Sequence, residues 1–585
     1  MSFMKRLLAV LLGCATALTV VGCATPTGPD NPPEEEVNRD KTQLYVFNYG
    51  GGFGREWLDA AKQRFEALHA DDVYEKGKRG VQIIIDHRKE SLTSEQYKTS
   101  SNEVFFTEGV NFYNLYNGDT FLDITDAVTE PLSDIDADDT QSIEDKMYDE
   151  QRDFFGVTEN GETKYYAVPH YSAFYGIMYD IDLFENNKYY FAKDQSLYEE
   201  SGLLEDKFIS NMNPTRSDGP DGTGGTYDDG LPATYEEFFE LCDYIASTSV
   251  MPIRWTGANY RDYLTALMVS LMVDYEGKDN MMINFTFDGS TVDNLGTLSG
   301  TDFVYDAQAT DIDESNGYEL SRTDSRYYAL KFLEQLCIDD NDHNKYHTDP
   351  VTQLDLAFNS GFSHMDAQEY FLQGGYDQGI GRAAMLIDGN WWQMEAANTF
   401  ESMADFYGDE LSAENRNIGI MPLPKANEQK VQEGKESGVR QTIVDAQYSV
   451  AFIKSTIDKN KIDLAKEFLR FVNTQESLVE YTTITNTPKA LDYSLSETEM
   501  AQLSPYGRST FTLLADSEIV YPYSKNPLYL NNVSFFRVIN LFNSYVGSTH
   551  YQWAAEAFRD YGITAEQYFT GMRSYYTEER WNQLT

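Results

Sequence analysis

Two adjacent tryptophans, Trp391 and Trp392, end an apolar stretch and follow the polar triplet Asp388-Gly389-Asn390. The chain has only six tryptophans, so a neighbouring pair concentrates a rare residue at one point. Tryptophan is costly to leave in water, and neighbours in an extended segment point in opposite directions. We therefore expect one ring to enter the core and the other to remain available for a different contact.

The glycine-rich segment at residues 50–54 is a second candidate, because it follows an expected strand and opens an expected helix. Phosphate-binding loops occupy that position. Its sequence, GGGFG, fits neither the dinucleotide-binding spacing nor the P-loop, and Phe53 would obstruct a diphosphate. The glycines favour the close approach of a ligand to the backbone, and they make Phe53 a candidate ligand contact.

Composition narrows the class of ligand. The formal net charge is −50, which repels nucleic acid and anionic lipid headgroups and argues against an anionic ligand. The chain also has 42 tyrosines and 34 phenylalanines, which favour neutral ligands contacted by aromatic faces. No Gly-x-Ser-x-Gly motif occurs, and the carboxylates are too numerous for a glycosidase pair to be recognised without geometry.

The acidic loop at residues 217–230 alternates carboxylates with turn-forming glycines. Its oxygen donors are Asp218, Asp221, Asp228 and Asp229. Hard oxygen ligands on a tight loop are typical of Ca²⁺ sites, although the spacing is not that of an EF-hand. A structural calcium is one interpretation, and a solvated glycine-rich linker is the other. We expect no other cofactor.

The N-terminus indicates export. Lys5 and Arg6 precede an apolar run at residues 7–21, and Cys23 follows a small residue. This pattern predicts a signal peptide over residues 1–22 and resembles a bacterial lipobox, in which the cysteine is lipid-modified, for instance with palmitate. Cys14 also follows such a pattern but would leave a very short apolar region. Residues 23–41 are rich in proline and acids, so we expect a lipidated cysteine followed by a flexible tether.

The elements that must position these residues alternate between strands and helices. Residues 44–47 and 81–88 are expected strands separated by a helix in which Trp57, Ala61 and Phe65 recur at helical spacing. This alternation predicts an α/β architecture with parallel sheets. Roughly 540 globular residues exceed a single core, so at least two lobes are expected. Cys242 and Cys337 fall on apolar helix faces, which predicts two buried free thiols.

Several motifs, in order along nearly the whole mature chain, resemble the family-one extracellular solute-binding proteins, the ligand-capturing subunits of carbohydrate ABC importers. After the lipobox and tether come the strand-loop-helix at 44–68, LDIT at 122–125, YAVP at 166–169, GIMY at 176–179, AMLIDGNW at 384–391, GIMPLP at 419–424, AKEFLRFV at 465–472 and TP at 487–488.

This resemblance implies a two-lobed, periplasmic-binding-protein-like fold of type II, whose lobes close on a ligand in the cleft between them. The N-terminal lobe would comprise residues 42–168 plus about 448–486. The C-terminal lobe would comprise about 176–440 plus 490–585. Hinge crossings are expected near residues 169–175, 440–448 and 486–490, where extended or proline-containing segments suit a hinge. The chain is longer than the maltodextrin-binding members across residues 274–326.

The resemblance also implies a ligand site. The position of Trp391 belongs to the family's sugar-stacking platform, and Trp392 would then pack behind it. The expected ligand-binding residues are Trp391, Phe106, Glu108, Tyr260, Phe536 and Tyr171, to which the strand-end and loop positions add Asp388 and Phe53.

The function implied is a non-enzymatic lipoprotein, monomeric and anchored to the cell membrane, which binds a neutral mono- or oligosaccharide and delivers it to an ABC permease. The alternative is a surface-anchored glycoside hydrolase, which would need paired carboxylates at one subsite. A peptide or metal receptor is disfavoured by the lack of a His/Cys ligand set. Nucleic acid is excluded as a partner by the charge.

Overall fold

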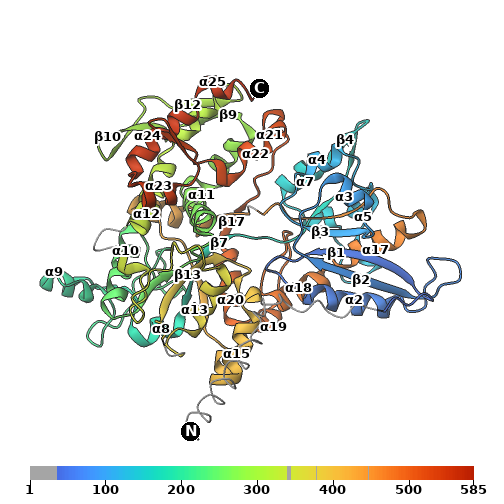
Figure 1. Cartoon of the computed structure of the whole chain (residues 1–585), viewed down its shortest axis with the longest axis horizontal. Helices are drawn as coiled ribbons and strands as arrows, with labels where there is room; N and C mark the ends of the chain where they lie inside the picture. Colours follow the sequence, from blue (N-terminus) through green and yellow to red (C-terminus); the bar gives the residue numbers. More distant parts are fainter. Residues whose placement is uncertain (1–35, 339–343, 377–378, 446, 585) are drawn as a thin grey trace, which may run out of the picture.

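The structure is a computed structural model that describes residues 36–338, 344–376, 379–445 and 447–584. The predicted signal peptide, Cys23 and most of the predicted tether lie outside the described residues. Within the described part of the chain, no helix is both long enough and apolar enough to cross a membrane. The remaining chain forms two lobes, which lie side by side in Figure 1.

The first lobe is built on a five-stranded sheet. Its order is β2 (Val81–Arg88), β1 (Thr42–Tyr49), β3 (Val104–Thr107), β16 (Val450–Ile453) and β6 (Val168–Pro169). β1 pairs in parallel with β2 and β3, whereas β16 is antiparallel to β3 and β6. The parallel part is the one that the alternation of strands and helices predicts, and β16 joins it from a distant part of the sequence.

Helices cover this sheet with apolar faces at helical spacing. They include α2 (Glu56–Leu68), α4 (Phe112–Asn117), α5 (Thr125–Thr129), α7 (Asp149–Phe155), α17 (Ile462–Phe471) and α18 (Gln475–Thr485). Trp57, Ala61 and Phe65 of α2 are buried. The ring of Phe65 packs against that of Phe468 at 5.1 Å between centroids, which joins two segments far apart in the sequence in one core.

The second lobe contains a four-stranded sheet in the order β14 (Ile418–Met421), β7 (Tyr175–Asp180), β13 (Ala383–Gly389) and β8 (Met251–Arg254). Every residue of β13 is buried, because helices cover both sides of this central strand. The helices of this lobe include α8 (Ile181–Asn187), α10 (Tyr235–Ser247), α11 (Tyr260–Thr286), α12 (Asp324–Cys337), α13 (His364–Gln373), α15 (Ala397–Tyr407) and α20 (Pro505–Ala515). Cys242 and Cys337 are buried free thiols, which confirms the prediction.

An outer layer of small elements extends the second lobe, at the top of Figure 1. It contains the two-stranded sheets β9 (Asp288–Val292) with β12 (Thr310–Asp313), β10 (Gly296–Ser299) with β11 (Asp302–Tyr305), and β18 (Ser544–Val546) with β19 (Thr549–Tyr551). The helices α23 (Ala554–Tyr561), α24 (Ala565–Tyr575) and α25 (Glu578–Trp581) complete it. Residues 288–313, within the segment expected to be longer than in the maltodextrin-binding members, therefore form part of this layer.

The chain passes between the lobes in extended segments. One runs from β6 to β7, and another runs from β15 (Gln441–Val444) to β16. β15 pairs in parallel with β17 (Ser517–Val520), after which Tyr521 and Tyr523 stack on Tyr148 and Phe154 of the first lobe. Asp445 lies at this junction, where its carboxylate accepts hydrogen bonds from the backbone amides of Ala173 and Gln447, each at 3.2 Å.

Candidate binding cleft

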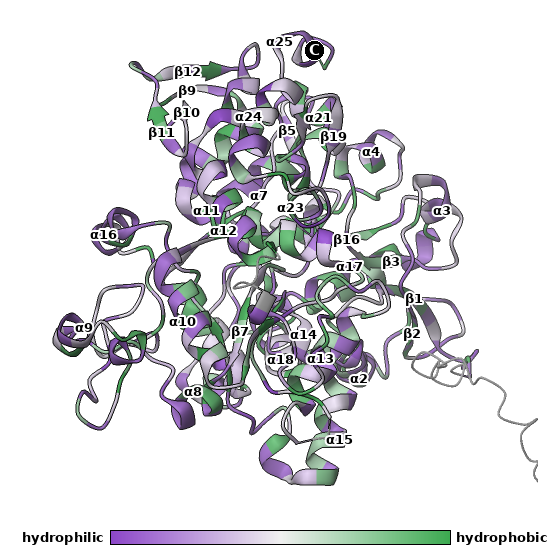
Figure 2. Ribbon diagram, turned by 60° about the vertical axis from the view of Figure 1, so that its left-hand side comes forward, coloured by the Kyte–Doolittle hydropathy of each residue, from purple (hydrophilic) through white to green (hydrophobic). Residues whose placement is uncertain are grey.

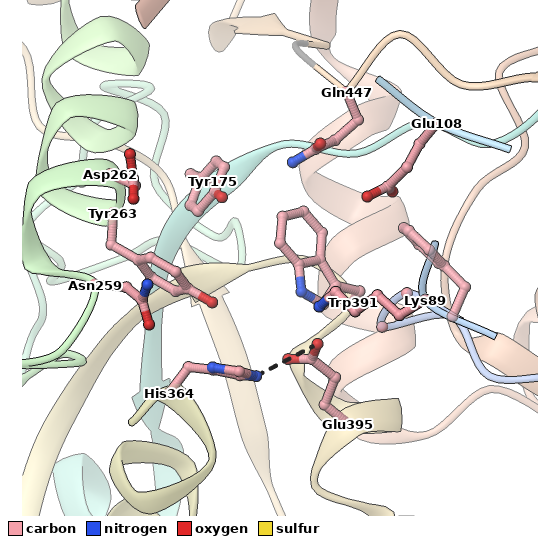
Figure 3. Close-up of a pocket in the computed structure, with 13 residues that line it drawn as sticks. Lys89, Glu108, Tyr175, Asn259, Asp262, Tyr263, His364, Trp391, Glu395 and Gln447 are labelled. Atoms are coloured by element: carbon pink, nitrogen blue, oxygen red, sulfur yellow. Dashed lines mark ion pairs between the residues drawn. The ribbon is translucent and has the colours of Figure 1, made fainter. Parts of the chain in front are cut away.

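A cavity of about 270 Å³ lies between the two lobes. It is lined by Gly51, Gly52, Phe53, Lys89, Glu108, Tyr175, Asn259, Asp262, Tyr263, His364, Trp391, Glu395 and Gln447. The first-lobe residues follow the carboxyl ends of β1, β2 and β3, and most of the others lie at the ends of strands or starts of helices in the second lobe. Ligands of open α/β sheets bind at such strand ends. Figure 3 shows these side chains approaching from both sides of the cavity.

The two tryptophans diverge, but not in the way that an extended segment would dictate. β13 ends at Gly389, and Trp391 is the residue that caps α14 (Trp392–Glu395), so the prediction of an extended pair was wrong. Trp392 is 0% exposed and packs in the core, whereas Trp391 is 8% exposed and lines the cavity. The turn at the end of the strand therefore separates the rings.

Trp391 contacts both lobes. Its ring lies edge-on to Tyr175 at 5.2 Å between centroids, and 6.0 Å from the ring of Phe53 in the other lobe. A β-carbon added at Gly52 would collide with Cδ1 of the indole, so the glycine is what permits the ring to rest on the backbone. Phe53 lines the cavity from the glycine loop, as expected for a ligand-facing position.

Glu108 is the carboxylate that the first lobe contributes, directly after β3. The hydroxyl of Tyr171 donates a hydrogen bond to it. Burial raises the pKa of Glu108 above its ordinary value, while the Tyr171 hydrogen bond and the charge of Lys89 act in the opposite direction. Tyr171 does not line the cavity, because its ring packs behind Phe53 at 4.0 Å. Tyr171 therefore lies behind the lining residues, in contact with Glu108 and Phe53.

The second lobe contributes Glu395, which is linked to Asp388 below the cavity. The side-chain amide of Gln368 donates to Asp388 at 3.1 Å and to Glu395 at 2.9 Å. On the same side of the cavity, Nε2 of His364 lies 3.9 Å from a carboxylate oxygen of Glu395 (Figure 3). Asp388 is buried and does not line the cavity, and burial beside Glu395 raises its pKa well above the usual range. Asp388 thus orders the amide that holds Glu395.

Besides Tyr171 and Asp388, three further expected ligand residues lie outside the lining of the cavity. Phe106 is still within β3 and is buried between Trp57 and His170. Phe536 is buried against Phe287 and Trp581 in the outer layer of the second lobe. Neither ring lines the cavity, because each packs in the core of its own lobe.

Tyr260 is the third. It packs against Phe358 and directs its hydroxyl to Asp560 at 3.4 Å. α11 begins at Tyr260, and residues three and four apart share one helix face. Asn259, Asp262 and Tyr263 therefore face the cavity together, whereas Tyr260 is rotated away. The start of α11 lines the cavity, but the phase of the helix places side chains other than that of Tyr260 there.

The sequence analysis did not identify Lys89, His364, Glu395 or Gln447. Lys89 follows β2 directly, so the strand-end rule that selected Asp388 also applies to it. Glu395 lies four residues beyond Trp391, on the next turn of the chain. His364 and Gln447 carry no comparable signal, because their positions depend on how separate segments meet in space.

The acidic loop at residues 217–230 meets internal partners. Asp218 pairs with Lys193 at 2.6 Å, and Asp221 pairs with Arg440 at 2.8 Å. Asp228 accepts from Thr226 at 2.7 Å, and Asp229 accepts from the backbone amide of Gly225 at 2.8 Å. Across the residues that the structure describes, no three His, Cys, Asp or Glu side chains are grouped to hold a metal ion. Calcium binding by this loop remains a prediction, and its carboxylates do not converge in this structure.

Comparisons with known proteins place the fold. No family model and no curated protein matches the chain. Among solved structures, the chain is similar to a chitin oligosaccharide binding protein, with a TM-score of 0.51 and 15% sequence identity over 93% of this chain and 100% of that chain. The chain has the two-lobed α/β fold of a solute-binding protein. This solute-binding-protein fold is of type II.

A second similar structure is maltose-bound T. maritima MalE3, with a TM-score of 0.49 and 13% identity over 93% of this chain and 100% of that chain. At these identities the likeness concerns the solute-binding-protein fold alone, and the ligand has to be argued from the residues of the cleft.

Proposed function

We propose that this protein captures a neutral mono- or oligosaccharide in the cleft between its lobes and delivers it to an ABC permease. The observation that carries the proposal is the composition of the cavity. Trp391 offers an aromatic ring, and Glu108, Asp262 and Glu395 bring carboxylates from both lobes to the same space.

This combination suits a sugar for a physical reason. A pyranose has an apolar C–H face that an indole can cover. It also has a rim of hydroxyls, which donate hydrogen bonds to carboxylates and exchange hydrogen bonds with side-chain amides. The three carboxylates outnumber Lys89, the one lysine or arginine among the lining residues, so an anionic ligand would be repelled. Because the lining residues come from both lobes, a bound ligand would stabilise the closed arrangement over an open one.

A thermal-shift screen against neutral sugars tests this proposal, followed by calorimetry on any sugar that raises the melting temperature. A ligand present at 100 times its dissociation constant adds about 2.7 kcal/mol to stability. Failure of every neutral mono- and oligosaccharide, together with stabilisation by a charged solute, would contradict the proposal. Incubation with the same glycans provides a second test, since release of shorter products would indicate a glycoside hydrolase instead.

We propose further that the protein acts outside the cytoplasmic membrane, held there by a lipid on Cys23. The support is the charged, apolar and small-residue pattern that precedes Cys23. Mass spectrometry of the native protein should find a lipidated peptide that begins at Cys23. Lipid on Cys14, or an unmodified N-terminus further along the chain, would contradict this assignment.

A further inference from the structure

Two of the segments that connect the lobes, here called hinge segments, meet at a lysine and a histidine in the interior. His170 follows β6 in the segment that leads to β7, a largely buried strand inside the second lobe (Figure 2). Lys489 lies in the segment that leaves α18 in the first lobe and leads to α20 in the second. The backbone joins the two segments, since the amide of Ser172 donates to the carbonyl of Pro488 at 3.1 Å. The amide of Ala490 likewise donates to the carbonyl of His170 at 3.3 Å.

The two side chains are in direct contact inside an aromatic enclosure. Nζ of Lys489 donates a hydrogen bond to Nδ1 of His170 at 2.7 Å, and each residue is only 3% exposed. The same ammonium lies 4.5 Å from the ring centroid of Trp57 and 4.4 Å from that of Tyr481. Phe106 adds a third ring at 5.8 Å. An ammonium over an aromatic face is attracted by the ring quadrupole, so these rings and the imidazole nitrogen take the place of a carboxylate.

No carboxylate compensates this pair within the part of the chain that the structure describes. Neither Lys489 nor His170 forms an ion pair with an acid there. Charged side chains on the two helices that supply rings to the enclosure, α2 and α18, pair with each other instead, as Arg64 does with Glu480 at 2.9 Å. Buried charges are ordinarily paired, because an uncompensated charge in a low-dielectric interior is costly.

The other titratable groups around the pair are neutral or face elsewhere. Burial raises the pKa of the hydroxyls of Tyr171, Tyr481 and Tyr493, so none of them supplies a negative charge at neutral or acidic pH. The carboxylate of Glu108 accepts from the hydroxyl of Tyr171, and that of Asp445 accepts from backbone amides. The pair therefore has no acidic partner on any of the elements that pack against it.

The contact accommodates one positive charge but not two. Nδ1 of His170 accepts the hydrogen bond from Lys489 only while that nitrogen is unprotonated. Burial and the charge of Lys489 lower the pKa of His170 well below its usual value, and burial lowers the pKa of Lys489 as well. A second proton on the pair would place two cations 2.7 Å apart without a counter-charge, so the contact must then break.

We propose that His170 and Lys489 form a pH-sensitive switch in the hinge, in which uptake of a second proton separates the two hinge segments and loosens the arrangement of the lobes. Because residues of both lobes line the cleft, the same loosening would open it. The switch resides in the hinge and does not depend on which ligand the cleft binds.

The direction of the effect distinguishes this pair from the acids nearby. A histidine whose pKa is lowered in the folded protein makes its full contribution to stability above about pH 6.5, and the contribution is lost as the pH falls towards the lowered pKa. Burial raises the pKa of Glu108 and of Asp445, so these carboxyls make the folded protein more stable as the pH falls. Loosening of the hinge in acid is therefore the opposite of what these two acids would produce.

Hydrogen–deuterium exchange of the unliganded full chain tests the proposal, with labelling times scaled to cancel the pH dependence of the intrinsic exchange rate. Peptides that cover residues 170–175 and 486–493 report on the two hinge segments, and peptides from β1 and β13 are internal references. We expect exchange of the hinge peptides to become at least about threefold faster between about pH 7 and about pH 5, with the references unchanged. Equal exchange of the hinge peptides at both pH values would overturn the proposal.

Two variants assign the response. His170→Asn keeps a hydrogen-bond acceptor for Lys489 but cannot titrate, and Lys489→Met keeps a long side chain but removes one of the two cations. Each should abolish the acid response of the hinge peptides. His69→Asn is the matched control and should retain the full response, since His69 is also buried in the first lobe but contacts the carboxylate of Asp72 at 2.8 Å.

An acid response that survives in His170→Asn would overturn the switch, because another group would then be the one that titrates. Should that variant fail to fold, Lys489→Met decides the question in the same way. The measurement uses no ligand, so its outcome is separate from that of the sugar screen that tests the proposed function.

Discussion

The indole of Trp391, from the second lobe, rests on the backbone of Gly52, from the first. A β-carbon at residue 52 would collide with the indole, and so would one at Gly389 on the strand that leads to it. The ring is therefore fitted between two glycines, one on either side of the cleft. This contact makes the distance between the lobes depend on the side chain at residue 52, and it gives the first prediction.

Gly52→Ala should hold the lobes apart. The added methyl group cannot occupy the position of the indole, so the contact between Gly52 and Trp391 must open. We expect a larger radius of gyration by small-angle X-ray scattering and weaker sugar binding. The double variant Gly52→Ala/Trp391→Ala restores the space and should recover the compact shape. An unchanged radius in Gly52→Ala would contradict the contact.

Trp391→Ala and Trp392→Ala should differ in kind. Loss of the Trp391 ring face should weaken sugar binding by on the order of 1–3 kcal/mol, with a smaller effect on the unliganded protein. Trp392 is fully buried against Phe371, Phe400 and Tyr506, so its removal should cost about 3–5 kcal/mol of stability. Calorimetric affinity and denaturant unfolding of both variants measure the two effects. The assignment fails if Trp391→Ala unfolds the protein while Trp392→Ala abolishes binding.

The sequence predicts the strands and helices of the two lobes better than it predicts the residues that line the cleft. Strands such as β1 and β13 are specified by local apolar runs and by the glycines that end them, so their positions follow from short segments. β16 joins the first sheet between β3 and β6 through pairings across hundreds of residues, which no local pattern encodes.

The cleft depends on such long-range contacts and on helix phase. Tyr260 was selected because aromatic rings bind sugars, yet the start of α11 turns Asn259 and Tyr263 towards the cavity instead. Phe106 and Phe536 illustrate a related error, since an aromatic residue beside a strand or helix end is equally suited to the core. Trp391, which does line the cavity, was selected because a longer motif surrounds it.

Glu108 should give sugar binding a pH dependence. An ionised carboxylate accepts hydrogen bonds from two ligand hydroxyls, so affinity should fall as the pH decreases through the raised pKa of Glu108. The Tyr171 hydrogen bond opposes that increase, and Tyr171→Phe should therefore shift the loss of affinity to a higher pH. Calorimetry across acidic and neutral pH measures the shift. Glu108→Gln is the control, and a pH profile that survives in it would assign the titration to another group.

The carboxyl of Asp445 should make the stability of the protein decrease as the pH rises. Burial at the junction of the crossings raises its pKa from 3.8 to about 7, with the charge of Glu108 acting in the same direction, although the amides of Ala173 and Gln447 oppose it. The ordinary value of an unfolded aspartate is about 3.9. Between these two pKa values the folded protein keeps the proton of Asp445, whereas the unfolded chain has lost it. The stabilisation that this group contributes is therefore fully present below about pH 4. The free energy of unfolding then falls by up to about 1.4 kcal/mol per pH unit as the pH approaches the folded value, and the loss is complete above it.

Asp445→Asn cannot titrate, so subtracting its unfolding curve from that of the wild type removes the contribution of all other acids. We expect the difference to change with pH over this window, measured by denaturant unfolding without ligand. A constant difference at every pH would mean that the substitution only costs a hydrogen bond, and that Asp445 stays ionised in the folded protein.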